Sequence, residues 1–289
     1  MTTNENLRAR ALAFRSLHVP GTPLVLPNAW DVTSARIVEG AGAAAVATTS
    51  AGLAWALGAA DGDRLARDAA LGAVAGIAAA VDVPVSADIE SGYARDAAGV
   101  AGTIRAVIEA GAVGVNIEDA LHEAGTGPLR PLAEQAERTA AAREAADAAG
   151  VPLFVNVRID TFLRGAGGVD ETLERAAAFL AAGADGIFVP GAVDPGTVKL
   201  LVDGIEGPLN VLAGPGAPPV AELAALGVAR VSAGSSIAQA AHALVRRAAG
   251  ELLGAGTYDS LAGGLDYGEL NTLMGGGRQA ASRISSARP

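Results

Sequence analysis

Acidic side chains follow directly after three apolar segments of the chain, and this pattern can carry chemistry. The three runs are SADIE at 86–90, NIED at 116–119 and NVRID at 156–160, and a further acidic run, DGD, stands at 61–63. Side chains alternate along a strand, so the polar groups of each run share a side. If the segments are parallel strands of one sheet, these groups meet at its carboxyl end.

Asp88, Glu90 and Glu118 are the strongest candidates for a metal site within these runs. Crowded carboxylates repel one another, so a cation is expected to hold them together. Oxygen ligands without histidine or cysteine suit a hard divalent ion, Mg²⁺ or Mn²⁺, which keeps some of its waters. The alternative is that each acid caps a helix or lies on the surface.

The candidates for substrate binding and acid catalysis are Arg158 and His122. The planar guanidinium of Arg158 can bind a carboxylate or a phosphonate through two parallel hydrogen bonds. His122 follows Glu118 in a glycine-containing segment at 120–130, which predicts a lid that carries a general acid. The alternative is a solvated loop histidine, with water or Tyr93 as the acid.

Two small-residue runs near the end of the pattern are weaker signals. GPG at 214–216 and AGSS at 233–236 are similar to the phosphate cradle of a barrel, where amides at a helix start face an anion. Ordinary tight turns and a helix cap explain them equally well.

Composition narrows the class of protein. The chain has 289 residues, a net charge of −10 and no cysteine. The acidic balance argues against binding to nucleic acid or to an anionic membrane, and the missing cysteine excludes disulfides and thiolate ligands. The first residues lack the apolar core of a signal peptide. The uncharged stretch at 40–60 reads as a buried strand and a small-residue loop, so we expect a cytoplasmic protein.

Short apolar segments that alternate with stretches of helical period must position these groups. They predict a TIM-type (β/α)8 barrel, whose active site lies at the carboxyl ends of the strands; a doubly wound open sheet is the alternative. We expect one domain over residues 1–289, with an N-terminal helix at 4–17 and a C-terminal helical extension from about 253. Strands are predicted at 23–27, 43–48, 83–88, 113–117, 152–157, 185–189, 208–212 and 228–232.

The sequence resembles the isocitrate lyase/phosphoenolpyruvate mutase superfamily in several runs, in the right order, over roughly residues 20–240. The run D-x-E-x-G-Y at 88–93 is the most specific. The others are PNAWD at 27–31, TTSAG at 48–52, LG and DG within 57–62, GVNIED at 114–119, NVRID at 156–160 and GADGIFVP at 183–190.

The resemblance implies a barrel whose last helix is exchanged between the subunits of a homodimer or homotetramer. It implies Mg²⁺ that Asp88 binds directly and that Asp61, Glu90 and Glu118 reach mainly through water. Mn²⁺ would be an acceptable replacement because it prefers the same oxygen ligands.

The resemblance also implies a 2-oxo or 2-hydroxy acid substrate and chemistry through an enolate. Backbone amides around Ser50, Gly52 and Leu53 would bind its carboxylate or oxyanion end, and Arg158 would bind the other end. Together with Glu118 and His122, Arg158 makes up the predicted catalytic set.

The loop ALHEAGTGP at 120–128 departs from the family patterns. It lacks the cysteine motif of the isocitrate and methylisocitrate lyases, and Ala120 replaces the lysine of the phosphorus–carbon enzymes. With these departures, the resemblance implies a Mg²⁺-dependent carbon–carbon lyase or decarboxylase for a small 2-oxo or 2-hydroxy di- or tricarboxylic acid, rather than either of those two lyases. The alternatives are a phosphorus–carbon enzyme, of the phosphoenolpyruvate mutase or phosphonopyruvate hydrolase type, and a non-catalytic 2-oxo acid binding protein.

Overall fold

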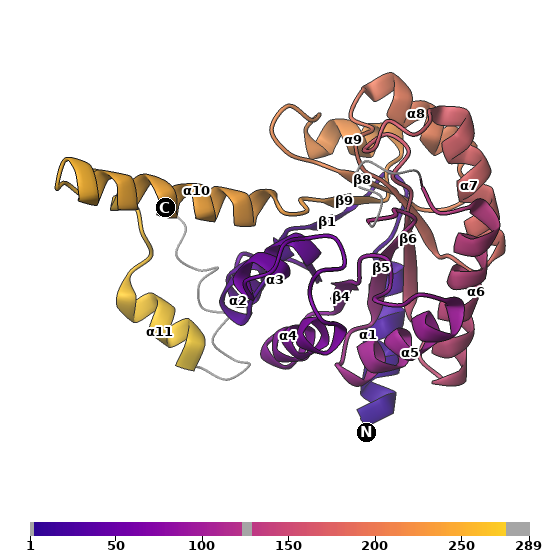
Figure 1. The fold of residues 1–289 in the computed structure, drawn as a ribbon, viewed down its shortest axis with the longest axis horizontal. Coiled ribbons are helices and arrows are strands. Elements are labelled where there is room, and N and C mark those ends of the chain that lie inside the picture. Colours follow the sequence, from indigo (N-terminus) through magenta and orange to yellow (C-terminus); the bar gives the residue numbers. More distant parts are fainter. Residues whose placement is uncertain (1–2, 123–128, 276–289) are drawn as a thin grey trace.

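Residues 3–122 and 129–275 are described by a computed structural model, in which a parallel barrel is surrounded by helices (Figure 1). The strands of this part of the chain pair in the order β1-β9-β8-β7-β6-β5-β4-β3-β2. They are β1 Leu24–Leu26, β2 Asn28–Ala29, β3 Val46–Thr48, β4 Val85–Asp88, β5 Gly114–Glu118, β6 Phe154–Arg158, β7 Gly186–Val189, β8 Leu209–Leu212 and β9 Arg230–Ser232.

Pro27 separates β1 from β2 and explains how the barrel closes. β1 pairs with β9 and β2 pairs with β3, so two pieces of one strand join the two ends of the order. Proline lacks the N–H that a ladder needs, and the first strand changes partner at this residue. The predicted TIM-type barrel is confirmed, and the open-sheet alternative is wrong.

Helices follow the strands around the barrel, as the sequence pattern predicts. They are α1 Thr3–Ser16, α2 Val32–Gly40, α3 Ser50–Ala56, α4 Arg67–Ala80, α5 Ala97–Glu109, α6 Leu132–Ala148, α7 Val169–Ala181, α8 Pro195–Gly204, α9 Val220–Leu226, α10 Ser236–Gly254, the 3₁₀ turn Asp259–Leu261 and α11 Tyr267–Gly275. Within the described residues, none of them is long and apolar enough to cross a bilayer.

The small-residue loop predicted after the second strand is wrong, because α3 starts there. Thr49 caps the helix in extended conformation, and the segment that follows, SAGLAWA, is rich in alanine, which favours helix. Gly52 lets α3 pack closely: a Cβ on it would lie 2.8 Å from the Cβ of Trp30. Leu53 is buried in the core.

Phe14 and His18, at the end of α1 and just after it, close the amino end of the barrel. Phe14 packs in a cluster with buried residues of β1, β3 and β6, and a Cβ on Gly114 would lie only 2.6 Å from its ring. The ring of His18 stacks on Phe154 with a centroid separation of 3.8 Å. The barrel therefore has a closed floor below and an open mouth at the strand ends.

Helix α10 touches the barrel with its first turns, where His242 contacts Trp55, and then extends away from it (Figure 1). Within the described residues, Ala238 and Ala248 are its buried side chains, whereas Val245 is 65% exposed and Leu253 is 89% exposed. The chain then returns through α11, where Arg36 donates to the carbonyl of Leu273 at 2.6 Å. Exchange of α10 between subunits stays a prediction, and so does the single-domain assignment of 1–289.

Candidate active site

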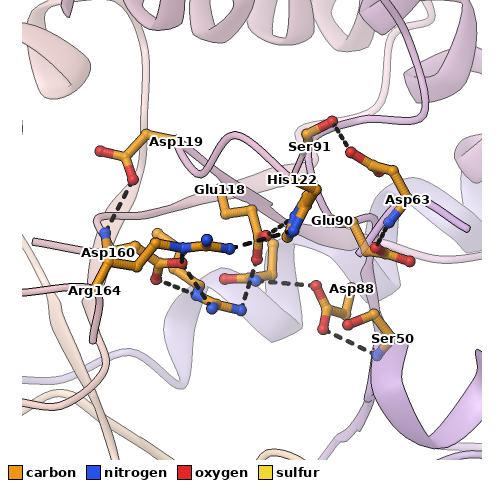
Figure 2. Close-up of polar contacts among 12 residues, drawn as sticks. Ser50, Asp63, Asp88, Glu90, Ser91, Glu118, Asp119, His122, Asp160 and Arg164 are labelled. Atoms are coloured by element: carbon orange, nitrogen blue, oxygen red, sulfur yellow. Dashed lines mark hydrogen bonds and ion pairs between the residues drawn. The ribbon is translucent and has the colours of Figure 1, made fainter. Parts of the chain in front are cut away.

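Asp88 ends β4 and makes hydrogen bonds to three neighbours, of which Ser50 is labelled in Figure 2. Its Oδ1 accepts from Nδ2 of Asn116 at 3.1 Å, and its Oδ2 accepts from the amide of Ser50 at 3.0 Å. Its own amide donates to Thr48 Oγ1 at 2.8 Å. Asn156 donates to Asn116 at 3.2 Å and extends the chain of hydrogen bonds to β6. The carboxylate is thus oriented before any ligand binds.

Asp61 and Glu90 bring further negative charge to Asp88. Asp61 stands at the exposed rim, where desolvation and the charge of Asp88 raise its pKa. Burial raises the pKa of Glu90 to about 7, and the charges of the neighbouring aspartates add to the effect. Glu90 accepts hydrogen bonds from the amide of Asp63 and, at 3.2 Å, from the hydroxyl of Tyr93.

Backbone strain gathers in the same place. Among the described residues, Asp63, Glu90 and Tyr93 are the non-glycine residues with positive φ, at 57°, 50° and 49°. Such conformations are costly and persist where the surroundings enforce them, often at functional sites. The three strained residues lie together at the acidic rim of the barrel, and this clustering is typical of a functional site.

Glu118 is paired with both His122, labelled in Figure 2, and Arg158. Each of these bases is 2.6 Å from one of its carboxylate oxygens. Burial raises the pKa of Glu118, and both bases oppose the shift. The hydrogen bond to Glu118 raises the pKa of His122, although Arg164, 3.2 Å from Nδ1, opposes it. The ring therefore keeps a proton on Nε2 against Glu118.

Arg158 is also bound by Asp160, which the sequence placed on the same side of the strand without giving it a role. Nε and NH2 of Arg158 donate to the two Asp160 oxygens at 2.6 and 2.9 Å. Burial opposes the charge of Arg158, but Glu118 and Asp160 outweigh it and raise its pKa. Behind them, the buried Asp119 accepts from the amide of Asp160 at 2.9 Å. Glu118 and Asp160 thus hold the Arg158 guanidinium in place.

A cavity of about 240 Å³ opens between these groups, lined by Asp61, Asp88 and Arg158 near the mouth and by Ser86 and Arg230 one step deeper in the barrel. A second cavity of about 410 Å³ is lined by Glu118, His122 and Arg164 and shares Asp61 and Arg158 with the first. Arg158 therefore stands between the predicted metal side of the site and the predicted acid His122.

The predicted substrate-binding amides are only partly at this cavity. Ser50 lines it, but its amide already donates to Asp88. The amide of Leu53 donates to the carbonyl of Thr49 at 3.0 Å inside α3. Ala51, which the sequence did not single out, lines the cavity, whereas Gly52 does not. The Gly52 position is explained by packing.

The structure gives the AGSS run a different use from the phosphate cradle. The amides of Ala233 and Gly234 both donate to Oδ1 of Asn28, at 3.0 and 2.8 Å. These two donors are therefore not free for an anion. The predicted lid at 120–130 falls mostly on 123–128, which lie outside the described residues.

The donor set fits a hard divalent cation. In the described residues, no three His, Asp or Glu side chains are placed to bind one ion together. Asp88 instead presents an oriented carboxylate next to Asp61 and Glu90, and its charge contributes to the raised pKa of both. An ion that one carboxylate binds directly, and that keeps its remaining waters, suits this arrangement.

Several known proteins are similar in sequence to this chain. The chain is 40% identical over 226 residues to the uncharacterized protein Rv1998c of Mycobacterium tuberculosis, covering 78% of this chain and 82% of that protein. It is 30% identical to the 2,3-dimethylmalate lyase of Eubacterium barkeri (71% and 72% covered) and 33% identical to the phosphoenolpyruvate phosphomutase of Streptomyces hygroscopicus (74% and 70% covered).

Solved structures resemble this fold as well. A candidate lyase/mutase from Burkholderia cenocepacia superposes with a TM-score of 0.89 at 39% identity, over 95% of this chain and 98% of that one. A phosphonopyruvate hydrolase, solved in complex with oxalate and Mg²⁺, gives a TM-score of 0.78 at 27% identity, over 95% of each chain.

The profile of phosphoenolpyruvate phosphomutase matches residues 14–253, which is most of the chain. Together with the lyase and mutase relatives, this match shows that the chain belongs to the phosphoenolpyruvate phosphomutase family and is an enzyme of the isocitrate lyase/phosphoenolpyruvate mutase superfamily.

Proposed function

We propose that this chain is a Mg²⁺-dependent carbon–carbon lyase or decarboxylase that acts on a small 2-oxo or 2-hydroxy di- or tricarboxylic acid. The observation that carries the proposal is Asp88, with both oxygens oriented by donors, at a cavity whose other charged wall is Arg158. The 2,3-dimethylmalate lyase relative supports carbon–carbon cleavage, and the Mg²⁺–oxalate complex of the phosphonopyruvate hydrolase supports the metal.

Asp88 would hold the ion directly, and Asp61, Glu90 and Glu118 would reach it through water. When bound, Mg²⁺ supplies positive charge where an enolate oxygen develops. Asn116 and the Ser50 amide keep the Asp88 carboxylate in one orientation. Their role is to avoid reorganisation at the moment of reaction.

Substrate binding and proton transfer would be carried out by Arg158, Glu118 and His122. Arg158 lines both cavities and is held rigid by Glu118 and Asp160, so it can bind the carboxylate next to the reacting bond. When that carbon–carbon bond breaks, its electron pair enters the enolate of one product. The other carbon leaves as carbon dioxide in a decarboxylation, or as the carbonyl of a 2-oxo acid whose former hydroxyl proton goes to solvent. A proton from His122 then goes to the enolate carbon, and Glu118 stabilises the ring that takes part.

Phosphorus–carbon chemistry is the second candidate. Identity of 33% to a phosphoenolpyruvate phosphomutase favours it, and the same oriented metal carboxylate would serve it. Ala120 argues against it, since the family resemblance places a lysine at this position in those enzymes.

Homo-oligomer formation is part of the proposal. Along α10, apolar side chains such as Val245 and Leu253 lack cover within the described part of the chain. A second copy that packs against α10 would bury them, and association of this kind is driven by apolar area.

The test is a substrate panel with Mg²⁺: oxaloacetate, 2-methylisocitrate, 2,3-dimethylmalate and phosphonopyruvate, each followed by release of 2-oxo acid and of phosphate. Pyruvate or propionate without phosphate supports carbon–carbon cleavage. Phosphate from phosphonopyruvate alone, or its rearrangement to phosphoenolpyruvate, would replace it with the second candidate. Tight binding of 2-oxo acids without any turnover would contradict both.

A further inference from the structure

Arg230 is a buried arginine inside the barrel that no carboxylate of the described residues pairs with. It starts β9 and is 3% exposed. Its one hydrogen bond runs from Nε to Ser232 Oγ at a long 3.4 Å, and its NH1 has no partner in the part of the chain that the structure describes. Burial of an unpaired charge is costly, so such a group is kept where a ligand compensates it.

Two more buried polar atoms, one on the strand next to Arg230 and one at the cavity that Arg230 lines, lack partners in the described residues. Asn210 is the register partner of Arg230 on β8, and its Nδ2 is buried without a hydrogen bond in the described residues. The same holds for Ser86 Oγ, on β4. Arg230 and Ser86 line the cavity that also holds Asp88. All three groups can donate hydrogen bonds, so the missing partner is rich in acceptors.

Within the described residues, no negative charge that acts on Arg230 comes from the floor below it. His18 lies there, and its Nδ1 faces the carbonyl of Phe14 at 2.9 Å, so the ring carries its proton on Nδ1. Burial lowers the pKa of His18 to about 3, and the positive charge of Arg230 contributes to this shift. Asp88, above, is the acid whose charge acts on Arg230. Once Asp88 binds a cation, the guanidinium is left without a counter-charge.

We propose that Arg230 and Ser86, which line the deeper part of the cavity, form an anion subsite that binds the distal carboxylate of the substrate, and that Asn210, beside Arg230 on β8, supports it. The inference rests on the proposed function for the other end of the substrate, at Asp88 and Arg158. It narrows the substrate class to small dicarboxylic acids that reach from the mouth to the floor. A cavity of about 240 Å³ is small beside the roughly 300–1,000 Å³ of common ligand pockets, which also favours a short acid.

The subsite and a purely structural role for Arg230 predict opposite effects on stability. If Arg230 is unpaired until an anionic ligand binds, Arg230→Met removes an unpaired buried charge and raises the melting temperature of the ligand-free protein. If it pairs with Asp88 to hold the fold, the same change lowers it. Arg175→Met is the matched control, since Arg175 pairs with Asp119 at 3.2 Å and its loss leaves a buried acid alone, which should lower the melting temperature.

Binding is measured by calorimetry with Mg²⁺, using pyruvate as a monocarboxylate and malonate, succinate and glutarate as dicarboxylates. For the tightest dicarboxylate, we expect Arg230→Met to raise Kd by about 30-fold or more, the scale of losing one charged hydrogen-bonded partner. Pyruvate, which reaches only the metal end, should bind within about threefold of wild type. Arg230→Lys keeps the charge and should give an intermediate loss for the dicarboxylate, which carries the test if the Met variant does not fold.

Unchanged dicarboxylate affinity in these variants would overturn the subsite. Equal losses for pyruvate and the dicarboxylate would overturn it too, because a general disturbance of the barrel would then be the cause. Failure of the proposed function is a separate result: it would appear as no turnover of any acid in the panel, while the dependence of dicarboxylate binding on Arg230 would still be measured.

Discussion

Two arginines inside the same barrel, Arg158 and Arg230, differ in what surrounds them. Arg158 is held by Glu118 and Asp160, each at 2.6 Å. Arg230 has a single long hydrogen bond to Ser232 and, within the described residues, no ion pair. Burial acts against the charge of both, yet the pKa of Arg158 is raised and that of Arg230 is lowered to about 10.

The comparison separates a charge that the fold has already compensated from one that it has not. A paired guanidinium is positioned before the substrate arrives, which suits a group that acts near the reacting bond. An unpaired one gains most when an anion binds, which suits a group that selects the substrate. Asp88 acts on the charge of both arginines, so the metal side of the site connects the two.

Asp88→Ala should have the largest effect, because it removes the proposed direct metal ligand that both arginines face. We expect activity and Mg²⁺-dependent ligand binding to be lost, whereas EDTA should inactivate the wild type and Mg²⁺ or Mn²⁺ should restore it. Asp203→Ala, in an exposed pair with Lys199, is the control. Unchanged Mg²⁺ dependence in Asp88→Ala would show that the metal site is elsewhere.

Arg158→Lys tests the compensated side of the comparison. An ammonium cannot reproduce the planar fork that meets Glu118 and Asp160. We expect a loss of about 2–4 kcal/mol in transition-state stabilisation, or roughly 30- to 1,000-fold in kcat/KM. Arg164→Lys, whose Nε is 3.6 Å from Asp160, should cost less. Activity of Arg158→Lys within about twofold of wild type would make Arg158 structural.

His122→Asn tests whether the acid stands next to Arg158. Turnover should fall by roughly 100-fold, a common contribution of a general acid, while the affinity for a substrate analogue holds. Exchange of the C3 protons of pyruvate in deuterated water should fall in parallel. If turnover and exchange are both unchanged, His122 has no catalytic part, and Tyr93, which donates to Glu90, becomes the next group to replace.

His18→Phe tests the floor below Arg230 and should have the smallest effect at neutral pH. The folded-state pKa of about 3 lies below the ordinary value of 6.5, so between these values the unfolded chain binds a proton that the folded chain does not. His18 therefore makes the unfolding free energy fall by up to about 1.4 kcal/mol per pH unit as the pH drops through this window.

The His18→Phe variant should lose that part of the slope in urea denaturation between pH 6.5 and 4. His242, which is on α10 and contacts Trp55 edge to face at 6.0 Å, provides the control variant His242→Phe. An identical slope in wild type and His18→Phe would mean that His18 is not held neutral on the floor.

The sequence predicted the barrel well because its signals are local. The run at 113–117 corresponds to β5, Gly114–Glu118, since a continuous apolar segment after a helix-ending glycine has few other readings. The helix Ser50–Ala56 was missed because alanine and glycine after a strand resemble a loop. The convergence of Asp88 and Glu118 at one mouth was predicted from strand alternation together with the parallel barrel.

The positions of Arg230 and Asn28 in the interior of the barrel could not be predicted from strand alternation. In a run such as VARVS, alternation does not say which side faces the interior until the barrel closes, so an arginine there looks like an outward residue. Asn28 accepts from Ala233 and Gly234 across the closure of the barrel, a contact between distant parts of the chain. The signal that could have been used is a polar residue that interrupts an apolar strand, as Asn210 and Arg230 do at paired positions.

Exchange of the C3 protons of pyruvate with deuterated water, followed by NMR, tests the central claim most directly, because it reports enolate formation whatever the natural substrate is. The account predicts exchange in the wild type that requires Mg²⁺, stops with EDTA and is absent in Asp88→Ala. Pyruvate that binds to saturation with Mg²⁺ and shows no exchange above the buffer rate would contradict it.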